Sequence, residues 1–416
     1  MKRGVNYFLV ILVLSFMSCQ KDMTAIETAI PNSATIHLES THQVIRGFGA
    51  ANIVSWRPDM TPEEINTAFG TGVGQLGFSI LRLRIPWQQS DFNINVPSAK
   101  AAYDMGVKII ASPWTPPPAL KTSNDIVGGR LKDDSYAVYA AHLKAFVDYM
   151  ANNGVPIYAI SVQNEPDVTV TYESCDWNAS EMLRFMKENV SEVGTGVFCA
   201  ESFNFNHGMT NPVLNDPIAS SNTAFIGGHI YGGGLTKYPL AGIKGKEVWM
   251  TEYLELSTDW DGALTTAKSI NDCMNANMSA YIWWYIVRFY GPIYDDDSRR
   301  PPGTEKGEIS KRGYAMSQFS RFIRPGYYRV DATANPQAGV YVSAYRGSSN
   351  MVIVVINYGS QPVDQTFIIS SETVKTFRPY VTSEIKNCQQ EKDINVSERM
   401  FAATLDASSI TTFVSE

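Results

Sequence analysis

The chain has 416 residues, of which 44% are hydrophobic and 12% aromatic, and its formal net charge is −7. Apolar material in this amount is enough for one large domain and a smaller one. The charges form no long runs and no strongly basic face is indicated, which argues against a nucleic-acid partner.

The first 19 residues are predicted to be a targeting segment. Lys2 and Arg3 precede an apolar stretch, Tyr7 to Met17, that is too short to span a bilayer as a mature helix. A small residue before Cys19 resembles a bacterial lipobox, in which the cysteine becomes the lipidated first residue; an ordinary secretory signal is the alternative. Both kinds of signal would direct export of the protein from the cytoplasm. Lipid at Cys19 would then be its membrane anchor, in the periplasm or at the cell surface.

Residues 20–33 lack hydrophobic periodicity, and we expect them to form a tether. Residues 34–40 alternate between apolar and polar side chains, which predicts a strand within the segment 34–43. Four cysteines follow Cys19 without the C-x-x-C spacing of a metal site. We expect free thiols, and a disulfide stays open as the alternative.

From residue 44 to residue 318, short apolar strands alternate with amphipathic helices. One predicted helix, 136–154, places Val138, Leu143, Phe146 and Met150 on one face. Further helices are predicted at 178–190 and 261–277, and strands at 44–51, 79–85, 108–114, 158–164, 196–202, 225–231, 247–252 and 280–286. Eight strands alternating with helices predict an α/β fold, a (β/α)8 TIM barrel. The alternative, a doubly wound open sheet, is disfavoured because no glycine-rich phosphate loop follows the first strand.

In residues 319–416 the pattern changes to short alternating strands separated by Gly, Ser and Asn turns. This pattern predicts a side β-sandwich, which the early strand in 34–43 is expected to join. No Pro-, Ser- or Gly-rich linker separates it from the barrel, so we expect the two parts to pack as one rigid unit.

Two of the predicted strands end in a carboxylate. In a (β/α)8 barrel the active site is built at the C-terminal ends of the strands, where Glu165 follows the fourth and Glu252 ends the seventh. Glycosidic hydrolysis needs two such groups at one sugar, one to protonate the leaving oxygen and one to attack the anomeric carbon or activate water. Asn164 fits a donor to the sugar 2-hydroxyl, and His229 and Tyr231 could orient the nucleophile. The pair predicts a glycosidase, although each glutamate alone could be a solvated surface residue.

Other catalytic signatures do not occur in the sequence. It contains no HExxH, no Gly-x-Ser-x-Gly elbow and no P-loop. The five histidines are too dispersed to suggest a zinc site. We therefore expect neither a metal nor a cofactor.

Several longer stretches resemble glycoside hydrolase family 30, and in particular its bacterial glucuronoxylanase branch. The resemblance runs from about residue 35 to the C-terminus, and the stretches that carry it are GFGAA, RLRIPW, SPWTPPP, VQNEPD, EVWMTEY, YIWWYIVRFYGPI, ISKRGYAMSQFSRFIRPGYYRVDAT and VYVSAY. The resemblance implies a barrel with a tightly attached side β-sandwich. It also implies retaining, endo-acting cleavage of the β-1,4-xylan backbone of glucuronoxylan, directed by glucuronic acid or 4-O-methylglucuronic acid branches.

The resemblance further implies roles for single residues. Glu165 matches the acid/base, Glu252 the nucleophile and Asn164 the partner of the 2-hydroxyl. Arg288 matches the arginine that pairs with the uronate; its alternative is a structural arginine held by acidic neighbours such as Asp295 to Asp297. The remaining implied substrate-binding positions are Trp114, which matches an aromatic subsite wall; Tyr231, near the nucleophile; Trp284 and Tyr290, beside Arg288; and Ser257, at a position that contacts the uronate.

The sequence also departs from that branch at the expected uronate site. Leu254 stands where the branch has a tyrosine, and Val287-Arg288-Phe289 stands where Arg-Arg-Ser is common. The charged loop 294–308 is longer than expected. The uronate requirement is therefore expected to be weaker than in the branch, unless the loop supplies replacement contacts.

Three functions stay open on the sequence. The first is a retaining glucuronoxylanase. The second is another activity of the same family: an exo-acting xylosidase, a β-glucosidase or a β-1,6-glucanase, which a closed pocket would favour. The third is a non-catalytic, surface glycan-binding lipoprotein, which the presence of both carboxylates argues against. We expect a monomer, because no feature indicates self-association.

Overall fold

The computed structural model describes residues 1, 30–371 and 373–415. The predicted signal segment with its Cys19, and residues 20–29 of the predicted tether, lie outside the described residues. The chain divides into Met1–Pro31 and Asn32–Glu416, and the account below concerns the second unit. No helix in the described residues is long and apolar enough to cross a membrane.

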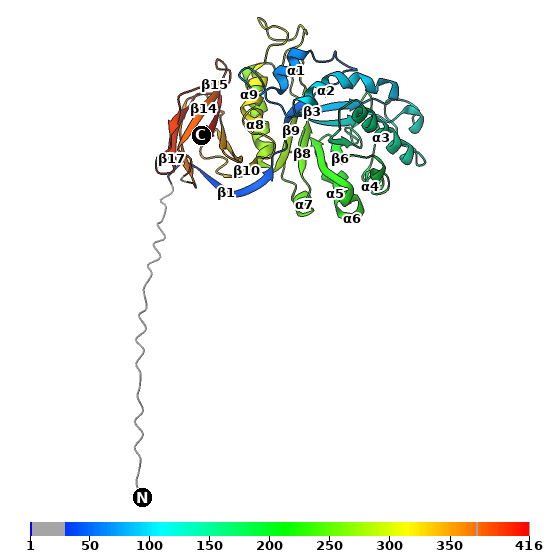
Figure 1. Ribbon diagram of the computed structural model, residues 1–416, viewed down its shortest axis with the longest axis horizontal. Coiled ribbons are helices and arrows are strands. Elements are labelled where there is room, and N and C mark those ends of the chain that lie inside the picture. The colour runs from blue at the N-terminus through cyan, green and yellow to red at the C-terminus, as the bar shows by residue number, and fades with distance from the viewer. Residues whose placement is uncertain (2–29, 372, 416) are drawn as a thin grey trace. The chain divides into compact units, whose positions relative to one another are not determined.

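Eight parallel strands close into a barrel (Figure 1). Each pairs with the next along the chain, and the last closes onto the first. The barrel strands are β2 Gly47–Ala51, β3 Ile80–Ile85, β4 Lys108–Pro113, β5 Ala159–Ser161, β6 Gly196–Ser202, β7 Thr223–His229, β8 Val248–Glu252 and β9 Met278–Tyr285. Every strand overlaps its expected range, so the predicted TIM barrel is confirmed and the open sheet is wrong.

An apolar cluster fills the barrel interior toward the starts of its strands. Each of β3 to β9 contributes to this cluster: Ile80, Ile110, Ala159, Phe198, Phe225, Trp249, Ala280 and Ile282. The ring of Phe225 stacks on those of Trp249 and Phe198, with centroid distances of 4.0 Å and 4.6 Å. Because these side chains close the N-terminal half of the barrel, its polar interior residues lie at the opposite, C-terminal end.

Helices cover the outside of the barrel. They are α1 Pro62–Phe69, α2 Val96–Asp104, α3 Tyr136–Asn152, α4 Ala179–Glu188, α5 His207–Asn215, α6 Pro217–Asn222, α7 Pro239–Ile243, α8 Trp260–Asn275 and α9 Lys311–Ser320, with 3-10 turns at Gln89–Asn95, Pro118–Leu120 and Val190–Glu192. In α3, Leu143, Phe146 and Met150 are buried as predicted, but Val138 is 54% exposed. Val138 lies five residues before Leu143, outside the three- and four-residue spacing of one helix face, and Tyr139 takes the buried position.

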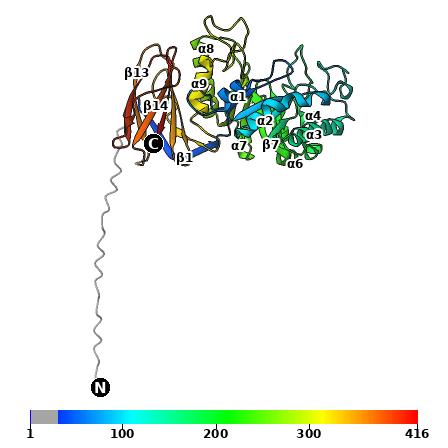
Figure 2. The same cartoon turned by 45° about the horizontal axis from the view of Figure 1, so that its top comes forward.

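The second sheet curls into a sandwich-like domain (Figures 1 and 2). Its order is β15-β14-β18-β12-β11-β10-β1-β13-β17, with β16 paired to β14. The strands are β1 Ala34–Val44, β10 Tyr328–Ala332, β11 Val340–Arg346, β12 Met351–Asn357, β13 Val363–Ile369, β14 Thr376–Thr382, β15 Gln389–Gln390, β16 Ile394–Asn395, β17 Met400–Leu405 and β18 Ser409–Ser415. The early strand β1 lies inside this sheet, antiparallel to β10 and parallel to β13.

Helices α8 and α9 pack against both the barrel and the second sheet. The larger hydrophobic core is continuous across the contact, since it includes barrel residues together with Val354 and Ile410 of the second sheet. The indole nitrogen of Trp260 in α8 donates to the carbonyl of Ser408 at 2.8 Å. The hydroxyl of Thr412 donates to the carbonyl of Gln318 in α9 at 2.7 Å. Shared core and buried hydrogen bonds hold the two domains together.

Candidate active site

Glu165 lies just past the short strand β5, where the chain turns sharply. Its backbone is left-handed, with φ of +46°, which is costly for a residue with a Cβ. Two hydrogen bonds hold the turn: Glu165 N donates to the carbonyl of Glu201 at 3.0 Å, and Asn164 N donates to that of Pro113 at 2.8 Å. The following Pro166 cannot continue the strand ladder. The turn thus places a buried carboxylate at the barrel mouth.

Glu252 is the last residue of β8 and is also buried. Arg82 Nη1 donates to its Oε2 at 2.6 Å, and Tyr231 Oη donates to its Oε1 at 3.0 Å. The pKa of Glu252 is raised, chiefly by burial and further by the charge of Glu165, while the charges of His229 and Arg82 oppose the rise. Both oxygens accept hydrogen bonds from fixed donors, which favour the ionised form and so limit this rise in pKa.

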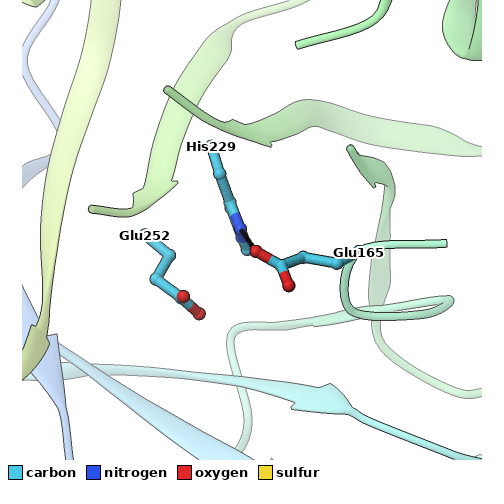
Figure 3. A group of neighbouring side chains, drawn as sticks. All are labelled: Glu165, His229 and Glu252. Carbon is cyan, nitrogen blue, oxygen red and sulfur yellow. Dashed lines mark hydrogen bonds and ion pairs between the residues drawn. The ribbon is translucent and has the colours of Figure 1, made fainter. Parts of the chain in front are cut away.

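The carboxylates of Glu165 and Glu252 face each other across the mouth (Figure 3). One oxygen of each, together with a ring nitrogen of His229, lie within 4.8 Å of one another. Carboxyl groups about 5–5.5 Å apart are typical of glycosidases that retain anomeric configuration, whereas inverting enzymes hold theirs roughly 6.5–9.5 Å apart to admit a water. The observed spacing is that of a retaining pair.

His229, the last residue of β7, connects the acid/base candidate to a third buried carboxylate. Its Nδ1 lies 2.9 Å from Glu165 Oε1 (Figure 3), and its Nε2 lies 3.7 Å from Glu201 Oε1. Burial alone would lower the pKa of His229, but Glu252, Glu165 and Glu201 outweigh it and raise the pKa to about 9. The ring is therefore an imidazolium at neutral pH, with an N–H toward each neighbouring glutamate.

Arg82, in the interior of β3, joins the remaining polar groups. Its Nη2 donates to Asn164 Oδ1 at 2.6 Å and lies 3.0 Å from Glu201 Oε1. Burial alone would raise the pKa of Glu201, but Arg82 and His229 lower it to about 2. Because a guanidinium can only donate, the Asn164 oxygen must face Arg82, which leaves its amide NH₂ as a donor for a ligand.

The same groups are a poor metal site. Glu165, His229 and Glu252 are close enough for their side-chain atoms to surround an ion. A histidine must be neutral to bind a metal, however, and the raised pKa of His229 opposes this. The four described cysteines, Cys175, Cys199, Cys273 and Cys388, are free thiols. The arrangement of Glu165, His229 and Glu252 therefore suits proton transfer better than metal binding.

A cleft of about 470 Å³ opens above the two carboxylates. Its wall includes Trp114, Trp284 and Trp56; the ring centroid of Trp56 lies 5.3 Å from that of Trp114 and 6.3 Å from that of Trp284. Trp56 is 38% exposed and Tyr172 is 46% exposed, so the cleft is open to solvent. Its lining comprises Trp56, Trp114, Glu165, Tyr172, Phe203, Tyr231, Glu252, Leu254, Trp284 and Tyr285. Aromatic faces around a carboxylate pair suit a sugar chain.

Five residues predicted to bind substrate lie outside this lining: Asn164 and His229, described above, and Arg288, Tyr290 and Ser257. Arg288 Nη1 is held by Asp295 at 2.9 Å and Asp297 at 3.1 Å, the ion pairs that the sequence offered as the alternative. Tyr290 is buried beside it, its ring centre 6.0 Å from the guanidinium carbon of Arg288. Ser257 donates its hydroxyl to Asp259, the N-cap of α8. Their contacts to a substrate stay predictions.

Four site residues were not predicted from the sequence. Arg82 is visible in the sequence as a charged residue of the predicted strand 79–85, but no role was predicted for it. Glu201, near the end of β6, reads as an ordinary strand-end acid. Trp56 and Tyr172 come from loops; Tyr172 donates to Glu165 Oε2 at 3.3 Å. Their positions depend on how each loop folds over the mouth, which residue patterns do not reveal.

Comparison with known proteins gives consistent results. The sequence model of the glycosyl hydrolase family 30 TIM-barrel domain matches residues 78–189. The chain is 41% identical to glucuronoxylanase XynC of Bacillus subtilis over 405 residues, which cover 94% of this chain and 93% of that protein. It resembles the crystal structure of a glycoside hydrolase family 30 subfamily 8 xylanase, Xyn30A of Clostridium acetobutylicum, with a TM-score of 0.86, 40% identity and coverage of 92% and 100%. For a family 30 endoxylanase of Clostridium papyrosolvens the TM-score is 0.83, with 39% identity and the same coverage.

Proposed function

The chain belongs to glycoside hydrolase family 30, and we propose that it is a retaining endo-xylanase that cleaves the β-1,4-xylan backbone of glucuronoxylan. The observation that carries the proposal is the pair Glu165 and Glu252, with carboxylate oxygens within 4.8 Å at the mouth of the barrel. The curated relatives at 41% identity, which are glucuronoxylanases, support the substrate class.

In the first step, Glu252 attacks the anomeric carbon while Glu165 protonates the departing glycosidic oxygen. The C1–oxygen bond to the leaving xylose breaks, and a glycosyl ester on Glu252 forms. Arg82 and Tyr231 hold the attacking carboxylate through one hydrogen bond to each oxygen. Asn164, oriented by Arg82, donates its amide NH₂ to the 2-hydroxyl, a contact that strengthens in the transition state.

In the second step, Glu165, now ionised, accepts a proton from water, and the water oxygen attacks the same carbon. The ester bond breaks and Glu252 is regenerated as a carboxylate. His229 supports the change of role, because its Nδ1–H can donate a hydrogen bond to Glu165 Oε1 while that carboxylate is negative, without giving up the proton. Each cycle therefore ends with both glutamates in their starting states.

An endo mode follows from the open cleft, since a closed pocket would accept only a chain end. The exposed Trp56 and Tyr172 border the lining and leave room for a polymer to continue past the carboxylates. Glucuronic acid or 4-O-methylglucuronic acid branches are part of the proposed substrate, and Arg288, three residues after the cleft residue Tyr285, holds the position that the resemblance assigns to their carboxylate.

The test is replacement of each glutamate. We expect Glu252→Ala to lower kcat on glucuronoxylan by at least about 10⁴-fold, the order seen when a nucleophile is removed. Glu165→Ala should retain slow glycosylation only of substrates with a good leaving group, and added azide should restore turnover. Circular dichroism provides the folding control. Near-normal hydrolysis by a folded Glu252→Ala protein would refute the assignment, and an inverted product anomer seen by NMR would refute the retaining mechanism.

We also propose export and lipid anchoring at Cys19, supported by the sequence of the first 19 residues. One acyl-modified cysteine would tie the enzyme to a cell-envelope membrane. In the native host, the protein should sediment with membranes, and Cys19→Ser should shift it to the soluble fraction without changing its specific activity. A Cys19→Ser protein that stays with the membranes would contradict the anchor.

A further inference from the structure

A cluster of alternating charges borders the cleft behind Tyr285. Tyr285 lines the cleft on one side and, on the other, a small hollow that Arg57, Asp295 and Asp296 also line. Arg57 directly follows the cleft residue Trp56 in the chain, and Arg288 comes three residues after Tyr285. We call this the rim cluster: Arg57, Arg288, Arg299, Asp295, Asp296 and Asp297.

The rim cluster is electrically neutral and internally paired. Asp295 lies 2.6 Å from Arg57 and 2.9 Å from Arg288, and its side chain is only 4% exposed. Asp297 lies 3.1 Å from Arg288 and 2.6 Å from Arg299. Three arginines and three aspartates cancel in net charge, and two of the aspartates bridge two arginines each. A carboxylate arriving from outside meets guanidinium groups that already have carboxylate partners.

The rest of the cleft offers a uronate no substitute. Among the described residues that line it, none is a lysine or an arginine, and two are the catalytic glutamates. Arg84, whose guanidinium lies 5.5 Å from the Trp56 ring, is bound through two nitrogens by Glu173. Leu254 presents an apolar side chain to the cleft. A branch carboxylate therefore meets no lysine or arginine among the described residues that line the cleft.

Two further cations of the loop 294–308, Arg300 and Lys306, do not supply a uronate partner in the cleft. Lys306 lines the hollow with Asp295 and Asp296, and does not line the cleft. Arg300 directs its guanidinium back into its own loop, with Nε donating to the carbonyl of Thr304 at 2.9 Å. The negative partners of Arg288 come from the same loop, 294–308, that the sequence marked as unusually long.

We propose that Asp295 and Asp297, which both hold Nη1 of Arg288, compete with a glucuronic acid branch for this guanidinium and so relieve the enzyme of the need for the branch. The inference rests on the proposed function and sharpens its substrate class: unsubstituted stretches of xylan are cleaved as well as branched ones. A uronate that binds Arg288 competes for Nη1 first with Asp297, which is the more exposed of its two partners. Asp297 is therefore a specificity-determining residue.

The experiment compares rates on glucuronoxylan and on linear, debranched xylan. Wild type should cleave both at comparable rates and release neutral xylo-oligosaccharides. Asp297→Asn, which keeps the side-chain oxygen that accepts from Arg299 N, leaves the cluster with a net positive charge. It should raise the ratio of glucuronoxylan to linear-xylan kcat/KM by about tenfold, as one charge-assisted hydrogen bond allows. Asp296→Ala removes one negative charge from the same cluster but neither partner of Arg288; it changes a 74% exposed residue 3.8 Å from Arg57 and should leave the ratio unchanged.

Adding Arg288→Ala to Asp297→Asn should return the ratio to the wild-type value. If the Asn variant does not fold, Asp297→Ser supplies the same comparison. A wild-type enzyme that cleaves only uronate-bearing xylan, or a ratio unmoved by Asp297→Asn, would overturn the inference while leaving the xylanase intact. Absence of activity on both xylans would instead overturn the proposed function, and the inference with it.

Discussion

Arg82 is the residue on which the geometry of the whole site depends. Its guanidinium contacts Glu252, Asn164 and Glu201, and its ring partners are Trp114 and Trp284, 4.8 Å and 5.8 Å away. Burying a cation among carboxylates is tolerable only when every partner is in place, and loss of one leaves an uncompensated charge. The nucleophile, the 2-hydroxyl donor and the aromatic wall are consequently fixed by one side chain.

His229 makes the stability of the folded protein depend on pH. Burial lowers its pKa, but Glu252, Glu165 and Glu201 outweigh it and raise the value from 6.5 to about 9. A group whose folded-state pKa is raised contributes its full stabilisation below its unfolded pKa, and loses it as the pH rises through the folded value. The free energy of unfolding should therefore fall between pH 6.5 and pH 9, by up to about 3 kcal/mol.

Urea denaturation across this pH range measures the effect. His229→Gln should remove most of the slope, because the neutral amide does not titrate. His142→Gln is the matched control: His142 is also buried, but its pKa is lowered, mainly by burial. A slope that persists in His229→Gln, or disappears in His142→Gln, would show that His229 is not the titrating group.

At the scale of elements, strands were predictable because each has a local signal. Buried parallel strands read as short apolar runs, and helix α4 begins at a capping box, Asn178 with Glu181, that is visible in the sequence. The boundaries of the strands were less predictable. Strands β7 and β9 both begin two residues before their expected starts, because pairing with neighbouring strands decides where each strand begins and ends.

The candidate site was predictable to the same extent. Glu165 and Glu252 could be found because strand ends in a barrel converge on one mouth. Tyr172 and Trp56 could not, because they come from loops whose path over that mouth depends on tertiary contacts such as Arg84 with Glu173. The pairing of Arg288 with Asp295 and Asp297 was visible only as one of two possibilities, because proximity along the chain does not choose between an internal and an external carboxylate.

At the scale of the molecule, strand β1 couples the folding of the barrel to the folding of the second sheet. Strand β1 enters the second sheet between β10 and β13 before the chain forms the first barrel strand. Ile36 and Leu38 of β1 belong to the core of the second sheet. Gln43, near the end of β1, donates to carbonyls of Met274 and Met278 in the barrel. The second sheet is thus completed by residues that precede the barrel.

We therefore expect the barrel and the second sheet to unfold together. A chain beginning at Ile30 keeps every described strand, and scanning calorimetry should give one transition with calorimetric and van't Hoff enthalpies that agree. A chain beginning at Ile45 lacks β1, which exposes the edges of β10 and β13 and empties the positions of Ile36 and Leu38. Losing each buried side chain costs about 2–5 kcal/mol, so this chain should fail to fold and should lack xylanase activity, although it retains every cleft residue. Two separate transitions in the longer chain, or an active shorter chain, would show that the barrel folds independently.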